Sequence, residues 1–63
     1  MKNESAKQLI RVILVDDHFV VRMGLASSLD EEEDISIIGE AASVEEALNL
    51  FEEKQPDVAV VDM

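Results

Sequence analysis

Short runs of aliphatic, mostly β-branched residues alternate along this chain with segments in which apolar residues recur at helical spacing. The runs are Leu9–Val15, Ile35–Ala42 and Val58–Val61, and in the first of them only Arg11 is polar. Such a run is typical of a strand that is covered on both faces, as in a parallel sheet. Strands that alternate with helices lie parallel and are joined by right-handed crossovers. The sequence therefore predicts an α/β fold with the element order β-α-β-α-β.

The first helix is predicted over residues 19–29. Val21, Leu25 and Leu29 recur four residues apart, which predicts that they share the face that packs against the sheet. A second stripe of this helix is expected to face outward and consists of Val20, Met23 and Ser27.

The second helix carries start and stop signals as well as an apolar stripe. Ser43 is a favourable N-cap, and Glu46 three residues later completes a capping box. Pro56 ends the helix, because the residue before a proline avoids the α region. The residues at helical spacing are Val44, Ala47, Leu48 and Phe51.

The second strand is predicted to alternate its side chains between the two faces of the sheet. One side is expected to carry Ile35, Ile37 and Gly39, and the other side Ser36, Ile38 and Glu40. Because one end of this strand is polar, we expect it at an edge of the sheet.

Composition limits the partners and the location of the chain. It carries 15 acidic and 5 basic residues, a net charge of −10, and no cysteine. So acidic a segment is not expected to bind nucleic acid or an anionic membrane surface, since such contacts need Lys and Arg. It shows no secretory signal and no apolar run long enough to span a membrane, so a cytoplasmic location is expected. Residues 1–8 are expected to form a flexible tail and residues 9–63 one small domain.

Three carboxylates stand where two of the predicted strands end. Asp16 and Asp17 follow the first strand, and Asp62 ends the third. Sites in open α/β sheets form at the carboxyl ends of the strands, and parallel strands bring these ends to one edge. A cluster of carboxylates is costly unless a cation occupies it or one of them is protonated, and oxygen ligands suit Mg²⁺. The alternative is that these residues only end the strands and contact water.

Three blocks of sequence occur in an order and spacing that resemble a known family. They are Val-Ile-Leu-Val-Asp-Asp-His at residues 12–18 followed by Val-Val-Arg-Met-Gly-Leu, Gly-Glu-Ala-Ala-Ser at 39–43, and Pro-Asp-Val-Ala-Val-Val-Asp-Met at 56–63. Together they resemble receiver domains of bacterial two-component response regulators of the NarL/FixJ (LuxR-type) branch. The resemblance covers residues 10–63 and implies the N-terminal half of a receiver. It implies a partial flavodoxin-like fold with strand order 2-1-3.

The resemblance also implies roles for individual residues. Asp62 matches the phosphoacceptor, Asp17 the direct Mg²⁺ ligand, and Asp16 the acidic neighbour that acts through a metal-bound water. His18 matches a residue frequent in this branch and is expected to line the mouth of the site without a chemical role. A receiver takes the phosphoryl group from a sensor histidine kinase onto its own Asp, which makes it a phosphoacceptor in control of transcription and not an enzyme.

The chain also departs from the family pattern. The 63 residues contain no counterpart of the family's third metal ligand, its phosphate-holding Ser/Thr and Lys, or the C-terminal helix-turn-helix domain that binds DNA. We therefore expect this segment to behave as a truncated receiver that binds Mg²⁺ weakly and is not competent for phosphorylation by itself.

Two other classes of function share part of this pattern. Phosphatases of the haloacid dehalogenase type also end a strand with a nucleophilic Asp and need a second Asp two residues later. Their nucleophile usually follows the first strand, whereas here the acidic pair Asp16 and Asp17 precedes the strand of Asp62, which disfavours this class. The other alternative is an interaction module or half-domain that self-associates without phosphate chemistry. An apolar third strand at the edge of a sheet is a template for another chain, which predicts a homodimer through Val58–Val61.

Overall fold

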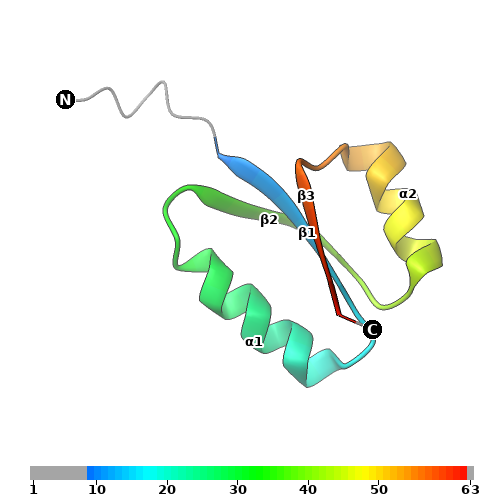
Figure 1. The fold of residues 1–63 in the computed structure, drawn as a ribbon, viewed down its shortest axis with the longest axis horizontal. Helices are drawn as coiled ribbons and strands as arrows, with labels where there is room; N and C mark the ends of the chain where they lie inside the picture. The colour runs from blue at the N-terminus through cyan, green and yellow to red at the C-terminus, as the bar shows by residue number, and fades with distance from the viewer. Residues whose placement is uncertain (1–8, 63) are drawn as a thin grey trace.

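The structure is a computed structural model that describes residues 9–62, so the tail expected at residues 1–8 lies outside the described part. Five elements follow one another in the predicted order (Figure 1). They are β1 (Ile10–Asp16), α1 (Phe19–Asp30), β2 (Ile35–Ala41), α2 (Val44–Lys54) and β3 (Val58–Asp62). Neither helix of this part of the chain is long and apolar enough to cross a membrane.

The three strands form one parallel sheet in the order β2-β1-β3, which confirms the predicted topology. β1 pairs on one edge with β2, where Ile10 lies opposite Ile35, and on the other edge with β3, where Val12 lies opposite Val58. The first crossover places β2 on one side of β1 within the sheet. The second crossover passes β1 and places β3 on its other side. As right-handed crossovers require, α1 and α2 therefore lie on opposite sides of the sheet (Figure 1).

The core is built around β1. Its residues Ile13 and Leu14 are fully buried. Ile13 and Val15 pack with Ala41 and Ala47 on the side of the sheet that α2 covers. Because side chains alternate along a strand, Leu14 points to the opposite side, where α1 packs. The nearly continuous apolar run of β1 thus fills both faces of the sheet.

A bulge in β2 changes which of its side chains share a face. Ile13 pairs with Gly39, and Ile38 is the extra residue of the bulge. Ile38 packs against the core under α2, and a Cβ on Gly39 would lie 3.2 Å from a methyl carbon of Leu50 on that same helix. Glu40 then returns to the side of α1. The predicted strict alternation is therefore wrong from Gly39 onward, since periodicity does not reveal an inserted residue.

The first helix packs against the sheet with two of the three residues predicted to face it, Leu25 and Leu29. Val21 is 44% exposed, so its predicted inward position is wrong. Val20 and Met23 are exposed as predicted. The residues that are half-buried on the packed side are Arg22, Leu25, Ala26 and Leu29. Arg22 also lies on this side, where its guanidinium contacts the Asp16 carbonyl of β1 and the Glu40 carboxylate of β2.

Only part of the predicted stripe of α2 is covered. Ala47 is buried and Leu50 is half-buried against the sheet. Val44, Leu48 and Phe51 are exposed. This helix packs on β1 and β2, and the three-stranded sheet is too narrow to cover an apolar stripe of that width. An apolar surface is thus left on the outer part of α2.

The ends of α2 are secured by specific hydrogen bonds. The Ser43 side chain accepts from the Glu46 N–H at 3.2 Å, and Glu46 Oε1 accepts from the Ala42 N–H at 2.9 Å, as a capping box predicts. Gln55 ends the helix in the left-handed conformation with φ 50°. The Arg11 guanidinium donates to the carbonyl oxygens of Gln55 and Lys54, and so supplies partners to the last turn.

The same arginine ties β1 to the loop before β3. The Arg11 N–H donates to Asp57 Oδ2 at 2.9 Å, and the Asp57 N–H donates to the Arg11 carbonyl at 2.8 Å. Arg11 therefore connects the amino ends of β1 and β3. These ends lie opposite the carboxyl ends of the strands, where the carboxylate site is predicted.

The cap of α2 provides a test of this packing. Ser43→Ala removes the acceptor of the Glu46 N–H and should lower the free energy of unfolding by about 1 kcal/mol. Ser27→Ala is the matched control, because Ser27 is an exposed residue inside α1, and it should change stability little. Urea unfolding followed by circular dichroism measures both. Equal losses in the two variants would contradict the role of the cap.

Candidate functional site

The carboxyl ends of β1 and β3 meet at one edge of the sheet. Asp16 is the last residue of β1, Asp62 is the last residue of β3, and the two are partners in the parallel ladder. Asp17 and His18 follow directly and lead into the N-terminus of α1 (Figure 1). The backbone therefore brings the acidic residues at the ends of β1 and β3 next to each other, as predicted.

Asp16 is a buried carboxylate. The residue is 1% exposed, and its Oδ1 accepts from the backbone N–H of His18 at 2.8 Å. Its other oxygen, Oδ2, is buried without a hydrogen-bond partner. A buried carboxylate oxygen that lacks a donor is costly and calls for a proton or a cation nearby.

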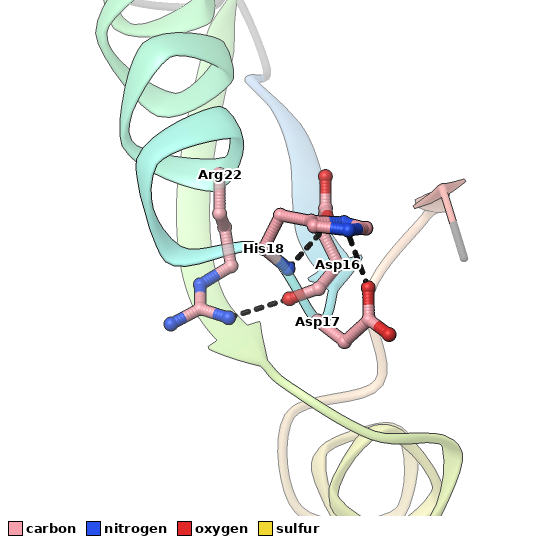
Figure 2. A network of polar contacts seen from close by, with 4 residues as sticks. All are labelled: Asp16, Asp17, His18 and Arg22. Atoms are coloured by element: carbon pink, nitrogen blue, oxygen red, sulfur yellow. Dashed lines mark hydrogen bonds and ion pairs between the residues drawn. The ribbon is translucent and has the colours of Figure 1, made fainter.

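The His18 ring lies against both carboxylates of the acidic pair. Its Nδ1 is 2.9 Å from Asp17 Oδ1 and 3.1 Å from Asp16 Oδ1 (Figure 2). Ligand atoms of these three residues lie within 4.8 Å of one another, whereas Asp62, although described, is not a member of this group. Sequence reasoning placed His18 at the mouth of the site but missed these contacts. Its position directly after two acidic residues was the available signal.

The acidic surroundings of His18 act on its protonation. The hydrogen bond with Asp16 raises the pKa of His18 above its ordinary value of 6.5, and the charges of Asp17, Asp16 and Asp62 raise it further against a small opposing effect of burial. The protonated ring is therefore favoured in the absence of another cation, because it offsets two carboxylates that no Lys or Arg side chain contacts in the described part of the chain.

Arg22 holds the strand end from the side of α1. Its guanidinium donates to the Asp16 carbonyl oxygen (Figure 2). It also pairs with Glu40 at 3.1 Å and lies 5.7 Å from the centre of the Phe19 ring. The Arg22 side chain is only 14% exposed. This residue joins α1, β1 and β2 at the site. The sequence does not predict the Arg22–Glu40 contact, because Glu40 was expected on the same side of β2 as Ile38.

The donor atoms at this edge fit a hard divalent cation. Asp16 and Asp17 present carboxylate oxygens, one of which is buried and has no donor, and Asp62 stands at the neighbouring strand end. Such oxygen ligands suit Mg²⁺ and Mn²⁺. The side chain of Asp17 is 55% exposed, so a cation can reach the pair from solvent.

Comparisons with known proteins agree with one another. The family model described as "Response regulator receiver domain" matches residues 12–63. The transcriptional regulatory protein LiaR of Bacillus subtilis is 49% identical over 55 residues, which are 87% of this chain and 26% of LiaR. The response regulator protein VraR of Staphylococcus epidermidis is 43% identical over 54 residues, 86% of this chain and 26% of VraR.

A third relative and a solved structure extend this agreement. The DNA-binding transcriptional activator DevR/DosR of Mycobacterium tuberculosis is 46% identical over 55 residues, 87% of this chain and 25% of that protein. The signal receiver domain of the putative response regulator NarL from the same organism superposes with a TM-score of 0.84 and 34% identity, over 87% of this chain and 44% of that one. The chain thus spans about a quarter of the curated relatives, 26% in LiaR.

The protonation of His18 provides a test of the site. In the chain without metal, the titration midpoint of the His18 ring should lie above 6.5, and Asp17→Asn should lower it without restoring the ordinary value, because Asp16 remains. Since the pKa is raised by folding, its contribution to stability is full below the ordinary pKa and is lost as pH rises through the folded pKa.

Imidazole nitrogen shifts measured by NMR over a pH series give these midpoints. Glu53→Gln, which removes an exposed carboxylate from α2, is the matched control and should leave the midpoint unchanged. A midpoint at or below the ordinary value in the unmodified chain would show that the two carboxylates do not hold the ring.

Proposed function

The chain belongs to the response regulator receiver domain family, and from this premise we propose that it supplies the phosphoacceptor segment of a two-component phosphorelay that controls transcription. Asp62 is the proposed phosphoacceptor and a sensor histidine kinase the proposed donor. The single observation that carries this proposal is the pairing of Asp16 with Asp62 at the carboxyl edge of the sheet, beside the exposed Asp17.

In this proposal Asp62 acts as the nucleophile. A carboxylate oxygen of Asp62 attacks the phosphorus of the phosphohistidine, the P–N bond breaks as the new P–O bond forms, and the imidazole keeps the electron pair and takes up a proton. The phosphoryl group stays on the chain, so the segment is an acceptor and not an enzyme that turns over a substrate. Asp62 is exposed, so the phosphohistidine of a kinase could reach its carboxylate.

Asp17 and Asp16 are the residues proposed to hold Mg²⁺ next to Asp62. When bound, this cation would neutralise the negative charge that attack on a phosphoryl group brings together. Asp17 is accessible and fits direct binding, whereas Asp16 is buried and already accepts from His18, which fits binding through water. Arg22 keeps Asp16 in place by holding its carbonyl oxygen and leaves the carboxylate free.

DNA binding is assigned in this proposal to another part of a longer protein and not to these residues. The chain has a net charge of −10, which opposes contact with phosphate backbones. The 55 matched residues make up only 26% of LiaR and 25% of DevR/DosR, so most of each relative lies outside the matched segment. A cytoplasmic location is part of the same proposal.

Self-association is a second function favoured by a specific observation. β3 pairs with β1 on one edge only and presents Val58 and Val61 as exposed apolar residues. An edge strand with free N–H and C=O groups pairs readily with another chain, and a two-fold contact closes on itself. We therefore include in the proposal a homodimer of the 63-residue chain in which two β3 strands pair antiparallel.

Phosphorylation tests the first part of the proposal. The 63-residue chain incubated with acetyl phosphate and Mg²⁺ should show no measurable phospho-adduct by intact-mass spectrometry, because it carries no counterpart of the family's Ser/Thr and Lys. In a chain that continues past residue 63 and restores those residues, incorporation should occur at Asp62. Asp62→Asn should abolish it there, and Asp30→Asn, a change in an exposed residue at the end of α1, should not.

The two results separate the parts of this proposal. An adduct on Asp62 of the 63-residue chain would contradict the expected lack of competence but support Asp62 as the acceptor. Incorporation that survives Asp62→Asn in the longer chain would contradict the assignment of the acceptor itself.

Sedimentation equilibrium over a concentration series tests the dimer. Association should strengthen with salt, since each chain carries a net charge of −10 and screening weakens the repulsion. Val61→Lys places a charge on the exposed face of β3 and should weaken association about tenfold or more, in line with the cost of an unpaired charge in an interface. Val20→Lys, at a more exposed position on α1, should have little effect. A folded monomer that persists at high protein concentration would refute the dimer.

A further inference from the structure

We propose that the surface over β3 beside α2 binds a helix–strand unit from a second polypeptide, namely the part of a receiver domain that has no counterpart in these 63 residues. Two chains would then assemble one receiver. The inference rests on the proposed phosphoacceptor role and names a partner for it. The unit would cover the face of β3 and pair with its free edge, so it competes with the proposed homodimer.

Three large apolar side chains of α2 stand in solvent. The exposed fraction is 59% for Val44, 58% for Leu48 and 41% for Phe51. Ala47 is buried and Leu50 packs against the core, so these two mark the side of α2 that faces the sheet. In the described part of the chain, α2 packs on β1 and β2 but makes no contact with β3. The three exposed residues thus form a second apolar stripe of this helix.

Helix geometry points this stripe toward β3. Successive residues turn by about 100° around the helix axis. Seen from the N-terminus of α2, the stripe lies roughly a quarter of a turn clockwise from Ala47 and Leu50. α2 is the crossover from β2 to β3, which lies beyond β1, and a right-handed crossover turns that clockwise side toward β3 (Figure 1). The stripe therefore borders the part of the sheet that α2 leaves uncovered.

β3 supplies the floor of this surface. Val61 is the ladder partner of Val15, which packs in the core under α2, so Val61 lies on the same side of the sheet. Its side chain is exposed, and Ala59 is half-buried against that core. The outer edge of β3 has no neighbouring strand in the described sheet. An apolar wall, an apolar floor and a free strand edge are thus adjacent.

A second copy of the chain does not cover this surface. When two β3 strands pair antiparallel, the two β1 strands lie three strand spacings apart, about 14 Å. Each α2 sits over β1 and β2, so the two helices lie at least that far apart. Packed helices lie about 8–10 Å apart, so the two apolar stripes do not meet. The homodimer therefore leaves Val44 and Leu48 in solvent.

A helix joined to a strand fits the surface. A helix packed about 8–10 Å from α2 lies over β3 and its free edge, where one apolar face covers both stripe and floor. The strand joined to it pairs with the unsatisfied main-chain groups of that edge. Glu45 and Glu52 border the stripe on the outer side of α2 and are exposed, so such a helix should present Lys or Arg beside them.

The NarL receiver domain indicates a source of this unit. The chain superposes on that structure with a TM-score of 0.84 but covers only 44% of it, so more than half of that receiver chain lies outside the match. The family's Ser/Thr and Lys have no counterpart in these 63 residues and are expected in that other part. A receiver assembled from two chains would bring them to Asp62.

Sedimentation velocity over a concentration series tests the proposal on the full 63-residue chain, refolded together with the unmatched part of the NarL receiver domain. A 1:1 complex should form at the expense of the homodimer. Leu48→Lys and Val44→Lys should each weaken this complex about tenfold or more, because an unpaired charge would be buried against an apolar partner. Met23→Lys, at an exposed position on α1, should leave it unchanged. None of the three variants should weaken the homodimer.

Phosphorylation of the mixture gives a second readout. A carboxylate oxygen of Asp62 would attack the phosphorus of acetyl phosphate, and acetate would leave as the new P–O bond forms. With Mg²⁺ present, the complex should therefore show one phosphoryl group on the 63-residue chain by intact-mass spectrometry. Asp62→Asn should abolish this adduct and leave the complex intact.

The outcomes distinguish this inference from the proposed function. Failure to form a complex, or a complex that Leu48→Lys and Val44→Lys leave as tight as before, would overturn the inference. A complex that depends on these two residues but carries no phosphoryl group on Asp62 would support the partner and contradict the assigned acceptor.

Discussion

The structure depends on the complete enclosure of β1. This strand has a neighbour on each edge and a helix over each face, so its aliphatic residues Ile13 and Leu14 lose all contact with water. Burial of such side chains supplies the main favourable free energy in a chain this small. The same enclosure carries the strand's last residue, Asp16, into the interior as a carboxylate. The site is thus a consequence of where the central strand ends.

Two arginines adapt the ends of this strand to their surroundings. At the amino end, the Arg11 guanidinium donates to the carbonyls of Lys54 and Gln55 at the end of α2. The Arg11 N–H donates to the Asp57 carboxylate, and the Arg11 carbonyl accepts from the Asp57 N–H. At the carboxyl end, Arg22 holds the Asp16 carbonyl and pairs with Glu40 of β2. Neither guanidinium neutralises the carboxylates of Asp16 and Asp17. The two arginines therefore stabilise the packing of the strands and helices. Among the basic side chains described, His18 alone contacts the carboxylates of Asp16 and Asp17.

This division explains the chemistry that the edge of the sheet can support. A buried carboxylate with an unpartnered oxygen, an exposed carboxylate beside it and an imidazole between them form a preorganised set of donors. Asp62, the proposed phosphoacceptor, is the partner of Asp16 at the adjacent strand end. No Lys or Arg side chain contacts these carboxylates in the described residues, so their charge is offset there by the His18 ring alone.

The sequence by itself determined the order of the elements, the cap of α2 at Ser43 and the positions of Asp16, Asp17 and Asp62 at strand ends, because these follow from local patterns of apolar and polar residues. Strand order was also predictable, but through resemblance to a family. Only the tertiary structure decided three features: the inward position of Arg22 on α1, the bulge at Ile38 and the contact of His18 with both carboxylates. Each of these depends on how one element sits against another, and such relations between distant residues leave no periodic trace along the chain.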